Sequence, residues 1–134
     1  MILTQKFHLD AAKAKEGVWL DYDGARFLLA HYGVANPRFQ YALASNFESL
    51  SETAADFEAF SSQQALEIAL FVDSVLLDWE EVYLSEEDKE PIPYSKEKAV
   101  EVLTSFPELR IELARLASEQ SNYAFKKEAE LVKN

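Results

Sequence analysis

The chain has 134 residues, of which 24 are acidic and 13 are basic, and its formal net charge is −11. Because this charge repels the phosphates of nucleic acids and of anionic membranes, we expect neither as a partner. The chain has no cysteine, which excludes disulfides and thiolate sites. It is apolar enough to fold, so we predict one domain over residues 1–134 in a reducing cytoplasm.

Membrane insertion and secretion are not expected either. Residues 1–17 contain no apolar run of the length that a signal sequence needs. The longest apolar region, residues 65–79, includes acidic side chains and is too short to span a bilayer. We therefore predict a soluble protein that is not exported.

The first predicted element is a β-hairpin over residues 17–33. Asp23-Gly24 stands between two β-prone runs, and this dipeptide favours a two-residue turn with positive φ at both positions. One face of the hairpin is apolar and must be covered by other elements, because a lone hairpin is unstable in water. The turn predicts that the paired residues are Tyr22–Ala25, Asp21–Arg26, Leu20–Phe27, Trp19–Leu28 and Val18–Leu29.

Two helices are predicted next, over residues 36–47 and 52–79. The first begins with Asn36 as N-cap and Pro37 at the first helical position. The second contains the densest apolar run of the chain, with Ser61-Ser62 as a candidate interruption. Its apolar surface covers most of the circumference, so we expect it to be central or shared with another subunit. Within the apolar run from residue 65, the polar positions Glu67, Ser74 and Asp78 fall on one narrow line. The apolar stripe of the first helix is Phe39, Ala42, Leu43 and Phe47.

The stretch from Leu76 to Ser95 joins an apolar run, an acidic turn and a PIPY sequence. Pro91 and Pro93 favour an extended backbone, which presents Ile92 and Tyr94 on a stiff segment. Ser95 then caps a helix over residues 95–106, and Pro107 opens a final helix over 107–130. The predicted fold is mainly α, a domain of about four to five helices with an N-terminal β-hairpin packed on it.

No sequence motif indicates catalysis, a cofactor or a metal. The three glycines stand alone, which excludes the P-loop and the dinucleotide fingerprint, and only two histidines are present. The acids between Trp79 and Pro91 lack the spacing of a calcium loop. Ser74 has the Asp-Ser-Val-Leu context of a carrier protein, but it lies inside a helical run instead of opening a helix. We therefore predict a protein that is not an enzyme.

Three segments resemble the tail assembly chaperones of long-tailed bacteriophages. They are GVWLDYDGARFLLAHYG with NPRF, then VLLDWEEV through PIPYSKEKAVEVL, and PELRIELARLASEQSNYAF, which correspond to residues 17–39, 75–103 and 107–125. The pairing of DWE with PIPYS is the most specific. Two positions depart from the pattern: Asp88-Lys89-Glu90 stands where a glycine is expected, and Phe106 stands where a capping aspartate is expected.

The resemblance implies a chaperone that binds the tape measure protein and helps recruit tail tube subunits. It also implies self-association, action in the host bacterial cytoplasm, and absence from the mature virion. The chain is similar to the short form of such proteins, whose longer form arises by frameshifting and contacts the major tail tube protein. We predict partner contacts at Trp79, Ile92, Pro93 and Tyr94, although these residues could equally belong to the core. Alternative readings are an acidic inhibitor that mimics DNA, a small enzyme, or a carrier protein.

Overall fold

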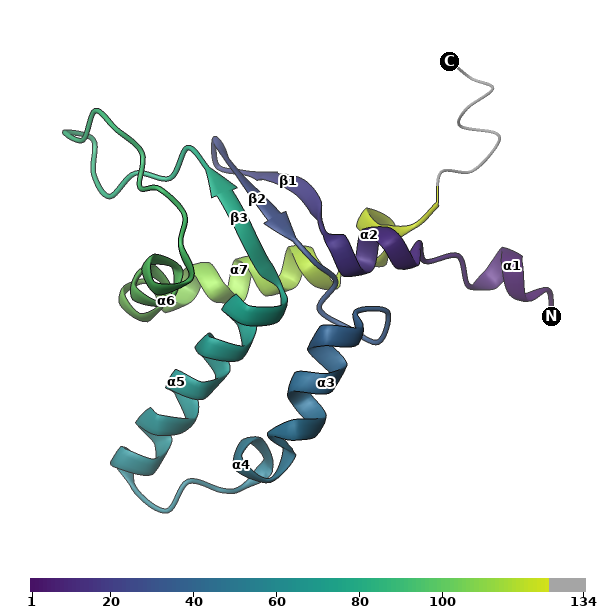
Figure 1. Ribbon diagram of the computed structural model, residues 1–134, viewed down its shortest axis with the longest axis horizontal. Coiled ribbons are helices and arrows are strands. Elements are labelled where there is room, and N and C mark those ends of the chain that lie inside the picture. The colour runs from purple at the N-terminus through teal and green to yellow at the C-terminus, as the bar shows by residue number, and fades with distance from the viewer. Residues whose placement is uncertain (126–134) are drawn as a thin grey trace.

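The computed structural model describes residues 1–125, which form a small antiparallel sheet with helices packed against it (Figure 1). Its elements follow one another in the order α1 (Leu3–Lys6), α2 (Ala11–Glu16), β1 (Val18–Tyr22), β2 (Ala25–Leu29), α3 (Pro37–Ser45), α4 (Phe47–Ser51), α5 (Phe57–Ser74), β3 (Leu76–Glu80), α6 (Lys96–Ser105), α7 (Pro107–Ser118) and the short 3-10 helix Gln120–Tyr123. The predicted fold class, mainly α with an N-terminal hairpin, is confirmed.

The hairpin has the predicted register at all five residue pairs. Asp23 and Gly24 both have positive φ, of 50° and 83°, as the two-residue turn requires. Phe27 and Leu29 are almost fully buried, and Leu20 packs against the same core. The turn dipeptide and the alternation of apolar residues therefore determine this element locally.

A third strand, β3, was not predicted. The sheet order is β1-β2-β3, and β3 pairs antiparallel with the outer edge of β2, with Trp79 opposite Phe27 and Glu80 opposite Arg26. The predicted helix over 52–79 was wrong at this end, because α5 stops at Ser74 and residues 76–80 are extended. An apolar run cannot by itself distinguish helix from strand, and the free backbone groups on β2 decide the outcome.

The helix boundaries differ from the prediction in three other places. The helix predicted over 36–47 ends at Ser45, and Phe47 opens the separate helix α4 with an exposed side chain. The next helix, α5, begins after Asp56, whose carboxylate accepts a hydrogen bond from the Ala59 amide, and it runs without a break through Ser61-Ser62. The predicted final helix ends at Ser118, and the rest of its predicted span beyond residue 125 lies outside the described residues.

Three predicted helix starts are confirmed. The Asn36 side chain accepts a hydrogen bond from the Phe39 amide, and Pro37 follows it at the first helical position. The Ser95 hydroxyl accepts a hydrogen bond from the Lys98 amide at 3.0 Å and opens α6. Pro107 opens α7, where Phe106 provides no side-chain cap, as its departure from the expected aspartate implied.

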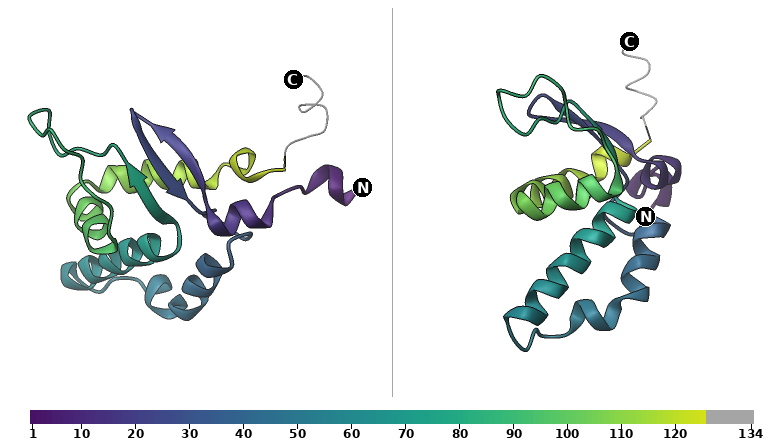
Figure 2. Two further views of the ribbon diagram at one scale, coloured as in Figure 1. Left: turned by 45° about the horizontal axis from the view of Figure 1, so that its top comes forward. Right: turned by 60° about the vertical axis from the view of Figure 1, so that its left-hand side comes forward.

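The core lies where the sheet meets α5, α6 and α7. Its buried side chains are Ala25, Phe27, Leu29, Phe39, Ile68, Phe71, Val72, Val75, Leu76, Trp79, Ala99, Val102, Leu103, Leu113 and Ala117. Helices α3, α4 and α5 form an arm that projects from this body (Figures 1 and 2). Within residues 1–125, no helix combines the length and the apolar character that crossing a bilayer requires.

Candidate binding surface

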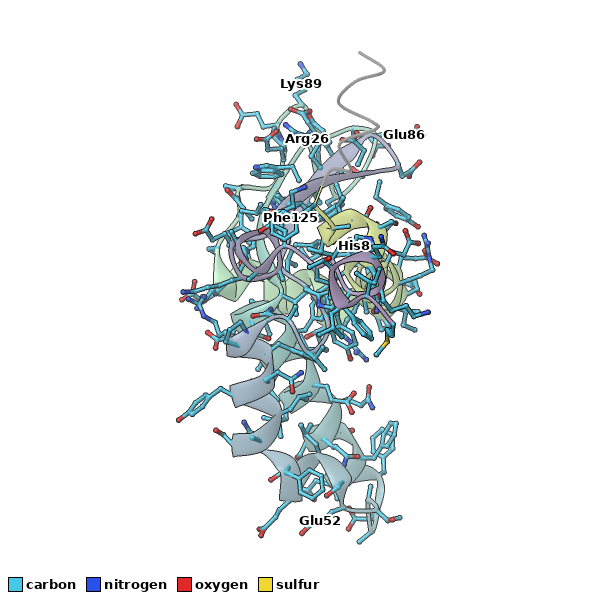
Figure 3. The ribbon with its side chains drawn as sticks, turned by 90° about the vertical axis from the view of Figure 1, so that its right-hand side faces the viewer. His8, Arg26, Glu52, Glu86, Lys89 and Phe125 are labelled. Atoms are coloured by element: carbon cyan, nitrogen blue, oxygen red, sulfur yellow. The ribbon has the colours of Figure 1, made fainter. Side chains whose placement is uncertain are left out.

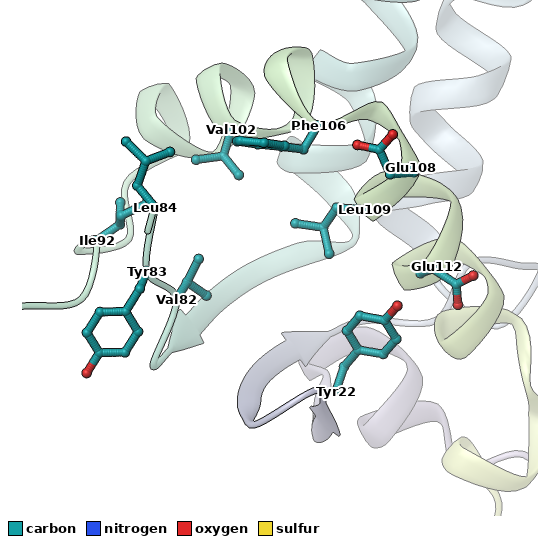
Figure 4. Close-up of a pocket in the computed structure, with 10 residues that line it drawn as sticks. All are labelled: Tyr22, Val82, Tyr83, Leu84, Ile92, Val102, Phe106, Glu108, Leu109 and Glu112. Carbon is teal, nitrogen blue, oxygen red and sulfur yellow. The ribbon is translucent and has the colours of Figure 1, made fainter. Parts of the chain in front are cut away.

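An open apolar groove lies at the end of the molecule where β3 runs into α6 and α7 (Figure 4). Its volume is about 500 Å³, which falls in the range of ligand and peptide sites. The groove is lined by Tyr22, Val82, Tyr83, Leu84, Ile92, Val102, Phe106, Glu108, Leu109 and Glu112. Two of its apolar side chains stand well out into solvent, with Leu84 65% exposed and Phe106 43% exposed.

One wall of the groove is the connection between β3 and α6, and buried aromatic residues hold it in place. The Trp79 indole donates a hydrogen bond from Nε1 to the Ile92 carbonyl at 2.7 Å. The Tyr94 hydroxyl donates to the Leu76 carbonyl at 2.7 Å, and the two aromatic rings meet edge to face. The prolines on either side of Ile92 restrict its backbone further. The position of Ile92 in the groove is therefore fixed from behind.

The start of this connection is also constrained. Glu81 has a φ of 60°, a left-handed conformation that turns the chain sharply away from β3. The Ile92 amide donates to the Val82 carbonyl at 2.6 Å, which brings the two ends of the connection together. Ser85 and Asp88 exchange two hydrogen bonds and form the tight turn where a glycine had been expected. Leu84 is thus carried on a closed loop.

The opposite wall is the junction between α6 and α7. Phe106 ends α6 and immediately precedes α7, because Pro107 cannot continue the first helix but can begin the second. Its ring is left at the junction, above Leu109 from the first turn of α7 (Figure 4). Tyr22, at the end of β1, closes the groove from the side of the hairpin.

Carboxylates surround the apolar floor of the groove. Glu108 and Glu112 project from α7 along its edge, and the acidic turn between Glu80 and Glu90 stands beyond Leu84. Glu112 also pairs with Arg115 at 3.1 Å, whereas the described residues include no ion pair for Glu108. An apolar groove with an acidic edge is suited to a segment that has apolar side chains on one face and cations beside them.

The family model described as YdaY prophage protein matches residues 30–134. The chain belongs to this YdaY prophage protein family. The matched range contains every residue of the groove except Tyr22. No curated protein and no solved structure matched the chain.

The predicted contact residues of this YdaY family protein divide into two groups. Trp79 is 4% exposed, and Tyr94 is half-buried with its hydroxyl bonded inside the fold, so both support the groove from within. Burial, together with the nearby Asp78 and Asp73, raises the pKa of Tyr94 and keeps the hydroxyl protonated as a donor. Ile92 lines the groove, and Pro93 faces solvent. The predicted partner contact at these four residues stays a prediction.

The sequence prediction missed the residues that form most of the apolar surface. These are Leu84, Val102, Phe106 and Leu109, which come from three separate segments. A local signal existed at Phe106, because a large apolar side chain directly before a helix-opening proline lies at the junction between two helices and in neither of them. The other contacts depend on how α6 packs beside α7, which the sequence does not reveal.

Three alternative sites lack the geometry that they would need in the described residues of the YdaY family chain. Ser74 is 1% exposed and its hydroxyl donates to the Leu70 carbonyl at 2.6 Å, so a modifying enzyme could not reach it as in a carrier protein. Among residues 1–125 no three histidine or acidic side chains lie together as a metal site would require. Several acids pair with cations, Asp73 with Lys96 and Glu80 with Arg26 among them, which differs from the uniform carboxylate face of a DNA mimic.

A buried polar junction lies behind the hairpin, away from the groove. Asn36 donates from its side-chain amide to the carbonyls of His31 and Ser74 at 3.0 and 2.9 Å. The Tyr123 hydroxyl donates to the Leu29 carbonyl at 2.9 Å, and its ring contacts the His31 ring. Burial lowers the pKa of His31 and raises that of Tyr123, so both rings are neutral near pH 7. These contacts join β2, α3, α5 and the 3-10 helix, which makes the junction structural.

Proposed function

We propose that this prophage protein is a tail assembly chaperone, which binds the tape measure protein during tail morphogenesis and catalyses no reaction. The observation that supports this proposal most is the open apolar groove with its acidic edge. Large exposed apolar surfaces on soluble proteins commonly mark interaction sites. Membership in a prophage protein family and the resemblance of three sequence segments to tail assembly chaperones point to the same role.

The groove fits a helical partner for simple geometric reasons. An amphipathic helix presents apolar side chains at every third and fourth position, and these side chains can enter a groove as successive anchors. Leu84, Ile92 and Phe106 would cover such a stripe, while Glu108 would face a basic residue at the helix edge. A long helical partner that is apolar along its length would be kept from aggregating by several copies of this chain.

Other parts of the proposal follow from the resemblance. A longer form, made by frameshifting, would contact the major tail tube protein and bring its subunits to the tape measure protein. The chain would act in the cytoplasm of the host bacterium and would be absent from the mature virion. Self-association of the chain is also implied by the resemblance.

The proposal can be tested by co-expression with the tape measure protein encoded by the same prophage. The double variant Leu84→Ser/Phe106→Ser removes the two most exposed apolar side chains of the groove. We expect recovery of the tape measure protein with this variant to fall by about tenfold or more, because apolar anchors at the centre of an interface carry most of its free energy.

The matched control is Ile111→Ser, on α7. Ile111 is 63% exposed, comparable to Leu84, but it does not line the groove. Circular dichroism must show that both variants are folded. Equal recovery of the tape measure protein with the wild-type chain and the folded groove variant would reject the groove as the binding site. Failure of the wild-type chain to bind the tape measure protein at all would reject the proposed function.

A further inference from the structure

A second apolar feature lies at the other end of the molecule. Residues 1–7, with the sequence MILTQKF, include the short helix α1, which buries none of its side chains. Leu3 is 62% exposed and Phe7 is 64% exposed, and Met1 and Ile2 are exposed as well. Apolar side chains concentrated on a segment without buried contacts are unusual for a soluble protein, and they indicate that the segment packs on something else.

The attachment of this segment to the body is defined. Leu9 pairs with Ala124 in an isolated bridge, and the Phe125 amide donates to the His8 carbonyl at 3.0 Å. His8 and Phe125 are labelled in Figure 3. Asp10 then caps α2 through hydrogen bonds to the amides of Ala12 and Lys13. The chain is therefore held from His8 onward, and residues 1–7 project beyond the point of attachment (Figure 1).

The groove and the projecting segment are complementary in chemistry. The groove has a volume of about 500 Å³ and an apolar lining, with Glu108 and Glu112 at its edge. The segment offers Ile2, Leu3 and Phe7, with Lys6 beside them. Apolar side chains with a flanking cation suit an apolar groove with an acidic edge.

The N-terminal end and the groove end also carry opposite charge. Residues 1–15 contain three lysines and one aspartate, so this end is basic although the whole chain is acidic. Residues 80–112, which provide nearly all of the groove, contain ten acidic and four basic residues. Two copies that met through unlike ends would attract one another, whereas contact between like ends would be repulsive.

The two features lie at opposite ends of the long axis of the molecule, so a chain cannot place residues 1–7 in its own groove (Figures 1 and 2). We propose that residues 1–7 of one copy bind the groove of a second copy. The contact joins two different surfaces, so it is heterologous and can continue from copy to copy. The structure thereby assigns a surface and a direction to self-association, which is head to tail.

The same groove would then have two occupants. If the proposed function holds, the tape measure protein competes with residues 1–7 of the neighbouring copy, and the free chaperone keeps its groove covered until the tape measure protein arrives. This competition rests on the proposed function. The head-to-tail association does not, because it requires only copies of the chain itself.

Sedimentation velocity over a concentration series tests the association without any tape measure protein. The triple variant Ile2→Ser/Leu3→Ser/Phe7→Ser changes only exposed side chains, so the fold should be unaffected. We expect the wild-type chain to associate, and the triple variant to associate with a dissociation constant raised by about tenfold or more. Phe57→Ser, at a position 83% exposed at the start of α5 and outside both features, should behave as the wild type.

A mixing experiment tests the direction of the contact. The triple variant keeps an intact groove, and the groove variant Leu84→Ser/Phe106→Ser keeps intact residues 1–7. Each variant alone should be monomeric, and an equimolar mixture should form one species of two chains that grows no further. A wild-type chain that stays monomeric, a triple variant that associates like the wild type, or a mixture that stays monomeric would each overturn the proposal.

The outcomes are separable from those of the tape measure experiment. The triple variant should still bind the tape measure protein, and should recover more of it than the wild type does at limiting concentrations. Loss of self-association with retained tape measure binding supports the inference, and self-association without tape measure binding rejects only the proposed function. A triple variant that neither loses self-association nor gains tape measure binding rejects the inference alone.

Discussion

The connection from Val82 to Tyr94 and the segment from Met1 to Phe7 both expose apolar side chains, yet they differ in how they are held. The connection is tied to the core by the Trp79 and Tyr94 side chains and by the hydrogen bond between Ile92 and Val82. The N-terminal segment has no buried residue and no comparable support. The same kind of side chain therefore occurs on a fixed surface at one end and on an unsupported segment at the other.

The two regions are suited to different roles in binding. A surface that is fixed before binding loses little conformational entropy when a partner arrives, which suits a receptor. A segment that projects from the body with exposed apolar side chains can enter a groove, which suits a ligand. The acidic charge around the first and the basic charge on the second fit these roles.

The largest effect is expected from removing the support of the groove. Trp79→Ala should lower the free energy of unfolding by about 3 to 5 kcal/mol, because it empties a buried site and frees the Ile92 carbonyl. Trp19→Ala is the matched control, since Trp19 is partly exposed on β1 and contacts Arg26. It should cost about 1 kcal/mol in urea denaturation. Equal losses for the two variants would show that Trp79 has no special role.

A smaller effect is expected from one hydroxyl group. Tyr94→Phe keeps the ring but removes the hydrogen bond to the Leu76 carbonyl, which should cost about 1 to 2 kcal/mol in the same measurement. Tyr83→Phe removes a hydroxyl that bonds only to the exposed Glu81 carboxylate, and it should change stability by less than about 0.5 kcal/mol. A larger loss of stability for Tyr83→Phe than for Tyr94→Phe would show that Tyr83, and not Tyr94, supports the groove.

Part of this fold could be predicted from the sequence alone. Asp23-Gly24, Asn36-Pro37 and Ser95 act on their immediate neighbours, so the hairpin register and two helix starts could be predicted. The strand from Leu76 to Trp79 could not be predicted in this way, because it depends on pairing with the free edge of β2, some fifty residues away in the chain. Even so, Arg26 and Glu80, which meet across that edge at 3.4 Å, are charges that a pairing search could have used.

The candidate site shows the same limit. The PIPY sequence drew attention to Ile92, and the structure places this residue in the lining of the groove. The stretch from Trp79 to Tyr94 suggested partner contacts for these two aromatic residues, with the core as an equal alternative, and the structure places their polar atoms in hydrogen bonds to the backbone of the fold. An aromatic side chain beside prolines looks the same in sequence whether it faces a partner or the core, and only the packing of α6 and α7 decides.

The pH dependence of stability tests whether His31, in the part of the body next to residues 1–7, is buried. Burial lowers the pKa of His31 below its ordinary value of 6.5. The unfolded chain therefore binds a proton that the folded chain resists, and stability should fall as pH drops below about 6.5. Urea denaturation from pH 8 to pH 5 should show a shallower decline for His31→Gln than for the wild type. Identical slopes would mean that His31 is as solvated in the folded chain as in the unfolded one.

The smallest effect is expected from the N-terminal segment itself. Ile2→Ser/Leu3→Ser/Phe7→Ser should change the free energy of unfolding by less than about 0.5 kcal/mol at a protein concentration where the chain is monomeric. A loss of more than about 1 kcal/mol would show that the segment belongs to the core of its own chain, and the contrast between the two ends would disappear.

The most direct measurement of the proposed role is site-specific photo-cross-linking in cells that express the tape measure protein. A photoreactive phenylalanine analogue in place of Phe106 lies in the groove, and the same analogue in place of Ile111 lies outside it on the neighbouring helix. We expect a covalent product with the tape measure protein from position 106 and little or none from position 111. A product from position 111 but none from position 106 would contradict the account.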